Sequence, residues 1–304
     1  MIIKVAEKHD GILLRTFLRG VLGFSGRSLT DLKKREDGIV LNGERVTVRA
    51  FVHAGDTLSL GIEDAGTGQN PKYRPIALPL EIVYEDENII CVNKGAGMPT
   101  HPTHGHREDT LANALAYYFE KSDMQFVFRP VNRLDADTSG IVIAAKNKAA
   151  CDYVAAQLRS RTAEKKYYAV LDGHAPQSGV IEGYIRRDGE SIITRSLHES
   201  GSAAEYSCTS YRVLEYIADK TLVEARPHTG RTHQLRVHFS SIGHPICSDT
   251  LYGSPDPDMP RQALEAYAVA FNLPFSGRRL SLDVPLSPDI KKFLEAVYER
   301  KKTV

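Results

Sequence analysis

The chain has 304 residues, 42% of them hydrophobic and 25% charged, with a formal net charge of +1, as expected for a soluble globular protein with one large domain and one small one. No run approaches the roughly 20 apolar residues that span a bilayer, and the first residues, MIIKVAEKHD, lack the core of a signal peptide. The four cysteines are far apart without a CxxC pair, which argues against a disulfide framework or thiolate zinc site and favours a reduced, cytoplasmic protein.

The first 60 residues predict a small basic unit of two helices and a hairpin. Apolar residues recur at helical spacing over residues 11–22, and a second helix follows a break, with Ser25 as its expected N-cap. Asn42 and Gly43 lie between two β-branched runs, which is typical of a type I′ turn, and a strand, DTLSL, follows. This segment holds ten bases and seven acids, a bias that weakly favours RNA contact.

The second of these helices carries the bases of the segment that we expect to bind RNA: Arg27, Lys33, Lys34 and Arg35. With the VLNGERV hairpin, the stretch from Ile12 to Leu60 resembles the αL RNA-binding module first described in ribosomal small-subunit protein four. The alternative interpretation is a solvated helix face. We assign residues 1–62 to a small N-terminal α/β module of this kind.

Residues 63–79 contain Gly, Asn and Pro without periodicity, which predicts a linker. Beyond it the segments EIVYEDENIICVNK, GIVIAAK, KYYAVLDG, AAEYSCTSYRVLEY and TLVEARP look extended, whereas LANALAYYF, KAACDYVAAQLRSR and THQLRVHFSSIG look helical. Strands of mixed spacing with few helices predict an α+β domain over residues 80–304, built on a mixed, largely antiparallel sheet rather than on repeated βαβ units.

The densest group of polar residues is RPVNRLDADTSGIVIAAKN, residues 129–147. Asp135 lies in a turn just before an apolar strand, which would hold its carboxylate rigidly and leave it accessible, as a nucleophile requires. An Asp that only caps a turn is the alternative beside Ser and Gly. However, RLDADTSG resembles the RLDxxTSG signature of RluA-type pseudouridine synthases. This resemblance implies a central cleft with Asp135 as catalytic residue, and Arg133 entering the RNA helix in place of the flipped base.

A second motif, AEKKYYAVLDG at residues 163–173, carries the aromatic candidate. Lys165, Tyr167 and Ala169 resemble the family's KxYxA motif, which implies that Tyr167 packs on the target uracil and that Lys165 contacts RNA. An aromatic face restores the stacking that a flipped base has lost, and the phenol is also a candidate base for the proton at carbon 5. Strand alternation alone does not choose between Tyr167 and Tyr168.

The third motif, residues 225–253, resembles the family's GRTHQxRVHxxxxGHPIxGDxxYG segment almost throughout. Thr232 is expected to cap a helix whose N-terminus, with Arg231 and His233 beside it, forms a site for a phosphate.

The same helix brings forward Arg236, which lies beside an apolar stripe of Leu235, Phe239 and Ile242 and is therefore expected to point inward. The resemblance pairs Arg236 with Asp135. The pairing is physically reasonable, because a guanidinium can hold a partly buried carboxylate bidentately and keep it ionised.

Three positions depart from the family pattern. Asn132 replaces the His that usually precedes the Arg, Ser248 replaces a usual Gly, and Glu265 replaces a frequent His. Asn keeps hydrogen bonding but does not titrate, so we expect no proton transfer there. For the other two positions, the resemblance does not predict the structure of the local loop or of the C-terminal region.

A metalloenzyme and a non-catalytic RNA-binding protein are the two alternatives to this interpretation. Histidines gather at residues 101–106 and 228–244, but spacings of five do not place pairs on one helix face and no Cys or acid completes a ligand set, so no metal is expected. A non-catalytic RNA-binding protein would be favoured if Asp135, Tyr167 or Arg236 were absent, and all three are present.

The three motifs follow one another in the family's order, so we interpret the chain as an RNA pseudouridine synthase. The reaction breaks the bond between the sugar and nitrogen 1 of uracil, rotates the base and rejoins it through carbon 5, with Asp135 either adding to the sugar or promoting elimination. No cofactor is implied. The expected partner is RNA, with large-subunit ribosomal RNA favoured over transfer RNA, and we expect a monomer without membrane attachment.

Overall fold

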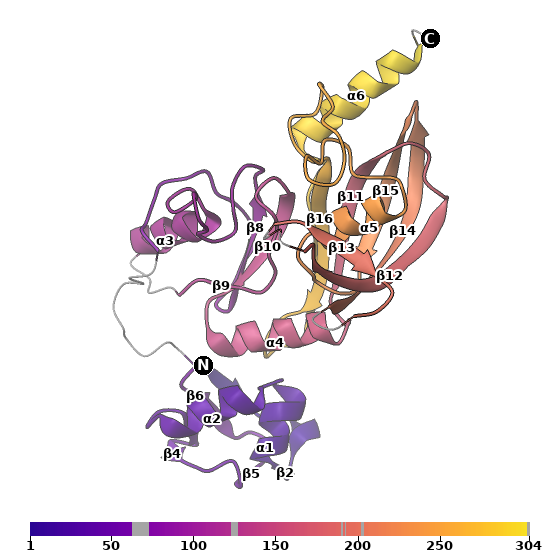
Figure 1. The fold of residues 1–304 in the computed structure, drawn as a ribbon. Coiled ribbons are helices and arrows are strands. Elements are labelled where there is room, and N and C mark those ends of the chain that lie inside the picture. The colour runs from indigo at the N-terminus through magenta and orange to yellow at the C-terminus, as the bar shows by residue number, and fades with distance from the viewer. Residues whose placement is uncertain (63–72, 123–126, 190, 192, 202–203, 303–304) are drawn as a thin grey trace.

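The computed structural model describes residues 1–62, 73–122, 127–189, 191, 193–201 and 204–302. Residues 63–72, most of the expected linker, lie outside the described residues, as does Ala203 at the start of one expected strand. The chain forms a small N-terminal part and a large sheet, and helix α4 (Lys148–Arg159) lies between them (Figure 1).

The N-terminal part is built on a four-stranded antiparallel sheet beside one small strand pair. In sheet order its strands are β1 (Ile2–Lys4), β6 (Thr57–Leu60), β3 (Ile39–Leu41) and β4 (Glu44–Arg45), and the pair is β2 (Ile12–Leu13) with β5 (Phe51–Val52). The hairpin prediction is confirmed, because Asn42 and Gly43 adopt φ of 52° and 86° between β3 and β4. A type I′ turn requires positive φ at both positions.

Helices cover this small sheet. They are η1 (Glu7–His9), α1 (Leu14–Thr16), which continues into the π-helical turn η2 (Phe17–Val21), and α2 (Gly26–Lys34). The first predicted helix was placed too early, because Ile12 and Leu13 pair with β5. The predicted cap is confirmed: Ser25 precedes α2, and its hydroxyl accepts the amide of Ser28.

The N-terminal part also packs on helix α4. The hydroxyls of Ser25 and Ser28 both donate to the Asp152 carboxylate, which therefore faces the amino end of α2. The ring of Phe24 stacks on Phe275 with centroids 5.5 Å apart. The two parts thus share polar and apolar contacts.

The large sheet has eleven strands, and the prediction of a mixed, largely antiparallel sheet is confirmed. Its main order is β13-β12-β14-β15-β11-β16-β10-β8-β7, with β17 on β16 and β9 on β10. The bounds are β7 (Glu81–Glu85), β8 (Ile89–Lys94), β9 (Arg129–Pro130), β10 (Ser139–Ala145), β11 (Glu164–Asp172), β12 (Ser178–Arg187), β13 (Arg195–His198), β14 (Glu205–Ile217), β15 (Lys220–Pro227), β16 (Leu264–Asn272) and β17 (Arg279–Asp283).

Strands β10 and β16 are the one parallel pair among the described residues, and their contact begins where the RLDADTSG motif ends. Ser139 pairs with Glu265 and Gly140 with Ala266. Gly140 has φ of 113°, and a Cβ there would lie 2.2 Å from the Ala266 carbonyl oxygen. Only glycine therefore allows β16 to approach the start of β10.

The other helices are α3 (Leu111–Lys121), α5 (Gln234–Ser241) and α6 (Pro288–Lys302), with α6 at the end of the molecule opposite the N-terminal part (Figure 1). No helix in the described part of the chain has the length and apolar character to cross a membrane. Strands β9, β12, β13, β16 and β17 and helix α6 were not predicted from the sequence.

Candidate active site

A cleft of about 1010 Å³ opens between the turn that precedes β10, the end of α4, and the facing ends of β11, β15 and α5. Many of its lining side chains are bases: Arg133, Arg159, Arg161, Lys165, Arg226, Arg231 and Arg236. A cleft with so many cationic groups suits a polyanion.

Asp135 lies in this cleft with its side chain 30% exposed. One carboxylate oxygen, Oδ2, is 3.2 Å from Nη1 of Arg236 and 3.9 Å from Nε2 of His233. The Asp135 carbonyl accepts the amide of Thr138, which closes the turn before β10. The carboxylate is therefore held in place on one side and open to the cleft on the other.

Arg236 joins two carboxylates rather than one. It is 7% exposed, and its Nε and Nη2 each donate to Asp249 at 2.7 Å, whereas a single bond reaches Asp135. The expected bidentate pairing with Asp135 is therefore wrong: the bidentate partner of Arg236 is Asp249, and Asp135 accepts a single hydrogen bond. Burial opposes the charge of Arg236, but hydrogen bonds and attraction from the two carboxylates outweigh it and raise the pKa of the guanidinium.

Asp249 was missed by the sequence reasoning, although it is the Asp of the GHPIxGD segment. Its side chain is fully buried, and Oδ1 also accepts the amides of Leu251 and Tyr252. The Arg236 guanidinium also lies 5.2 Å from the centre of the Tyr252 ring. Asp249 therefore fixes the orientation in which Arg236 meets Asp135.

Tyr167 and Tyr168 point to opposite faces of the sheet, as neighbours on a strand do. Tyr167 lines the cleft and is 7% exposed, whereas Tyr168 stacks on Tyr267 with centroids 3.8 Å apart. Burial, and then the negative charge of Asp135, raises the pKa of Tyr167. The phenol is therefore neutral at physiological pH, which favours a stacking surface over a base.

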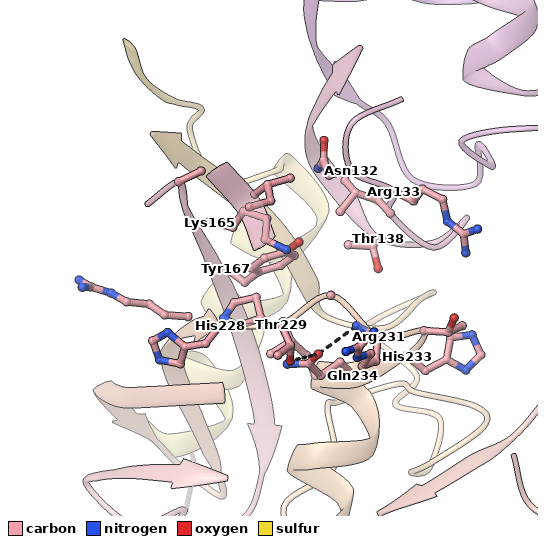
Figure 2. Close-up of a pocket in the computed structure, with 18 of the residues that line it drawn as sticks. Asn132, Arg133, Thr138, Lys165, Tyr167, His228, Thr229, Arg231, His233 and Gln234 are labelled. Carbon is pink, nitrogen blue, oxygen red and sulfur yellow. Dashed lines mark hydrogen bonds between the residues drawn. The ribbon is translucent and has the colours of Figure 1, made fainter. Parts of the chain in front are cut away.

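Figure 2 shows Lys165 beside Tyr167, with the segment that carries Asn132, Arg133 and Thr138 next to them. Lys165 is half-buried, and burial lowers the pKa of its amine to about 8. Among the described residues, the side chains of Lys165 and of the exposed Arg133 have no hydrogen-bond or ion-pair partner. Both cations are therefore free to contact a ligand.

Comparison with known proteins identifies the family of the chain. The model of a family described as RNA pseudouridylate synthase matches residues 88–241, which include Asp135, Tyr167 and Arg236. The chain belongs to the RNA pseudouridine synthase family. It is 37% identical over 304 aligned residues to ribosomal large subunit pseudouridine synthase D of Nitrosomonas europaea, covering 97% of this chain and 87% of that protein.

Other relatives agree. The uncharacterized RNA pseudouridine synthase YjbO of Bacillus subtilis is 33% identical, covering 91% of this chain and 96% of that one. Among solved structures, human RNA pseudouridylate synthase domain containing 1 is 29% identical with a TM-score of 0.56, and the match covers 72% of this chain and 94% of that one. The protein is therefore an RNA pseudouridine synthase, an isomerase.

In this pseudouridine synthase, the side chain of Asn132 is bound to the backbone of β10. Its amide nitrogen donates to the Ile141 carbonyl at 3.1 Å, and its oxygen accepts the Ile143 amide at 2.7 Å. The side chain thus ties the turn to β10, and neither bond needs a group that titrates.

The other two departures also have structural roles. Ser248 adopts φ of 57°, where glycine is favoured, and its hydroxyl donates to the Met259 carbonyl and accepts the Asp256 amide. Glu265 is buried and accepts the amide of Ser287 at 2.8 Å. Burial raises the pKa of Glu265.

The expected cap at Thr232 is wrong. Helix α5 begins one residue later, with His233 at its N-cap in the left-handed conformation, φ 57°. Gln234 stabilises this entry, because its side-chain oxygen accepts the Arg231 amide and the Thr229 hydroxyl (Figure 2). The sequence shows that Gln234 is a polar residue at the start of the helix, but it does not show that Thr229 and Arg231 are its partners.

Arg231 and His233 both line the cleft, but each already has protein partners. Arg231 is 2.6 Å from Glu205, and Nδ1 of His233 is 2.9 Å from the Tyr252 hydroxyl. Burial lowers the pKa of His233, so its imidazole is neutral at physiological pH. A phosphate at this point would have to displace or share these contacts.

The four bases predicted on the second helix do not line the cleft. Arg27, Lys33 and Lys34 lie exposed on α2, whereas Arg35, just after the helix, is half-buried and pairs with Asp37 at 3.3 Å.

The histidines of the third motif have separate partners: His228 meets Ser210, His238 meets Ser207, and His244 meets the Asp172 carbonyl. In the described part of the chain no three His, Cys, Asp or Glu side chains converge in a metal-binding arrangement.

Proposed function

We propose that this RNA pseudouridine synthase converts uridines of large-subunit ribosomal RNA to pseudouridine, with Asp135 as its catalytic carboxylate. The observation that carries the proposal is the position of Asp135: its carboxylate is open to a cationic cleft and is oriented by Arg236, whose own direction is fixed by Asp249.

The reaction is balanced within the substrate. The bond from the sugar to nitrogen 1 of uracil breaks, a bond from the sugar to carbon 5 forms, the proton at carbon 5 is lost and nitrogen 1 is protonated. Asp135 acts on the sugar, and the neutral Tyr167 ring supports the detached base by stacking. Lys165 and Arg133, which have no protein partner among the described residues, contact the RNA.

The choice of ribosomal RNA rests on the relatives. Three of them, at 34–37% identity, are named ribosomal large subunit pseudouridine synthase D. We further propose that residues 1–62 form an RNA-binding module, since Arg27, Lys33 and Lys34 stand exposed on α2. Residues 80–304 then form the catalytic domain, with residues 63–79 as the linker.

The test is to map pseudouridine in cellular RNA with and without the gene, and with the Asp135→Asn protein. We expect sites in large-subunit ribosomal RNA to disappear in both deficient strains. Loss confined to transfer RNA would overturn the choice of substrate. Sites that persist with Asp135→Asn would overturn the role of the carboxylate.

A further inference from the structure

The turn that carries Asp135 is held by side chains from distant parts of the chain. Lys94 donates to the Ala136 carbonyl at 2.9 Å, and Arg261 donates to the Asp137 carbonyl at 3.0 Å. Gln262 donates to the Thr138 hydroxyl at 2.6 Å. Each of the three residues that follow Asp135 is thus bound by a side chain from another part of the chain.

Arg261 is the most highly connected of these groups. It is 7% exposed, and besides Asp137 its guanidinium reaches the Ser139 hydroxyl and the carbonyls of Gln262 and Leu264. Such a planar, permanently charged donor cannot be replaced by lysine without losing several contacts. Lys94 differs: burial, followed by repulsion from Arg261, lowers the pKa of its amine to about 7.

Asp289 in the first turn of α6 holds the other edge of Arg261. Nε and Nη2 of the guanidinium donate to the two Asp289 oxygens at 2.6 and 2.9 Å, and Nη2 also reaches the Ser287 hydroxyl. Because an aspartate in the first turn also complements the helix dipole, α6 supplies a fixed anchor. One side chain therefore links the C-terminal helix to the catalytic turn.

Arg261 is buried and does not line the cleft, so a role in direct RNA contact is not expected. We propose that Arg261 is a positioning residue for the catalytic turn, and that Asp289 makes helix α6 part of the active-site scaffold. The proposal rests on the assignment of Asp135 as the catalytic carboxylate. The rival interpretation is that the Arg261–Asp289 pair only stabilises the fold.

The experiment compares Arg261→Met and Arg261→Lys with a matched control, Arg300→Met. Arg300 lies on α6, as Asp289 does, and it pairs with Asp256 and Asp258 rather than with the turn. Turnover is measured by tritium release from ribosomal RNA labelled at carbon 5 of uridine, beside RNA affinity and thermal melting. All rates are taken below the melting point of each variant.

We expect Arg261→Met to lower kcat about 100-fold, the scale of loss that a small misplacement of a reacting group causes, with RNA affinity unchanged. Arg261→Lys should recover part of kcat, because an amine can still reach the Asp137 carbonyl. A folded Arg261→Met protein with the kcat of Arg300→Met would overturn the proposal, as would a loss of RNA affinity in place of kcat.

Two further measurements cover other outcomes. If Arg261→Met does not fold, Asp289→Asn keeps the buried arginine and loosens only its anchor; it should lower kcat, and an unchanged kcat would overturn the proposal. Amide hydrogen exchange over residues 134–139 should rise in Asp289→Asn and not in Arg300→Met. This second readout does not use activity, so it tests the positioning role even if the wild-type protein releases no tritium, a result that would overturn the proposed function instead.

Discussion

Helix α2 and the turn that carries Asp135 use basic side chains in opposite ways. On α2, Lys33 and Lys34 are exposed, and among the described residues neither is within salt-bridge distance of a carboxylate. At the turn, Arg236 and Arg261 are buried: Arg236 binds Asp135 and Asp249, and Arg261 binds Asp289 and several backbone carbonyls. An exposed cation can exchange water and counterions for phosphates, whereas a buried, paired cation holds geometry. Exposure therefore separates binding from positioning, and RNA affinity should be separable from turnover.

The largest effect is expected for Asp135→Asn, because the amide retains the shape but not the chemistry of the carboxylate. Turnover should fall below a few per cent, while RNA affinity stays within a few-fold. Tritium release and a binding titration measure the two quantities. Asp137→Asn is the matched control, since Asp137 is an exposed carboxylate in the same turn; equal losses in both variants would contradict a specific role for Asp135.

Arg236→Met should come next. Turnover should drop strongly, because Asp135 loses the guanidinium that orients it and the unpaired Asp249 adds negative charge nearby. Stability should also fall by roughly 3–5 kcal/mol, the usual cost of breaking a buried ion pair. Tritium release and a urea titration measure these changes. Wild-type turnover in the Arg236→Met protein would show that Arg236 does not act through Asp135.

His238 sharpens the comparison, because it is a buried base without a carboxylate partner. Its Nε2 meets the Ser207 hydroxyl and its Nδ1 has no partner, and burial lowers its pKa from 6.5 to about 4. In the unfolded chain His238 therefore binds a proton below about pH 6.5, whereas in the folded protein it does so only below about pH 4. Stability should fall by about 2 kcal/mol between pH 7 and pH 5 from this group.

Urea titrations at the two pH values measure that loss. His238→Leu should reduce the difference between them, whereas replacing the exposed His104 by Leu should leave it unchanged. If the difference is the same in His238→Leu and wild type, other groups cause it.

The smallest effect is expected for Lys33→Ala with Lys34→Ala. RNA affinity should weaken a few-fold, and the slope of log affinity against log salt should become shallower by up to about 2, since fewer counterions are released. Turnover at saturating RNA should not change. Lys291→Ala with Lys292→Ala removes two exposed bases from α6 as the control, and an equal change of slope in the control would mean that α2 has no special part in binding.

Local features were readable from the sequence where neighbouring residues determine them. The Ser25 cap and the Asn42–Gly43 turn each depend on a few adjacent positions. The cap at Thr232 was misjudged because His233 takes a left-handed conformation that a motif does not reveal. Strands β12 and β16 were missed because their alternation is irregular and their pairing comes from distant segments.

The same limit applied to the site. Residue spacing placed Arg236 on an inward face, and the family resemblance paired it with Asp135, but nothing local indicates that Asp249 takes its guanidinium fork. Arg261 drew no attention, since its partners lie in the turn before β10 and in α6. Side chains that position site residues from distant parts of the chain can be identified only from the folded structure.

The parallel pairing of β10 and β16 has a consequence for folding during synthesis. A ribosome releases the N-terminal bases first, and the supports of the catalytic turn, Arg261 and Asp289, emerge more than a hundred residues after Asp135. Contacts so far apart in sequence form late in folding. On the roles proposed above, a growing chain would bind RNA before it could isomerise a uridine, because β16 and α6 are synthesised last.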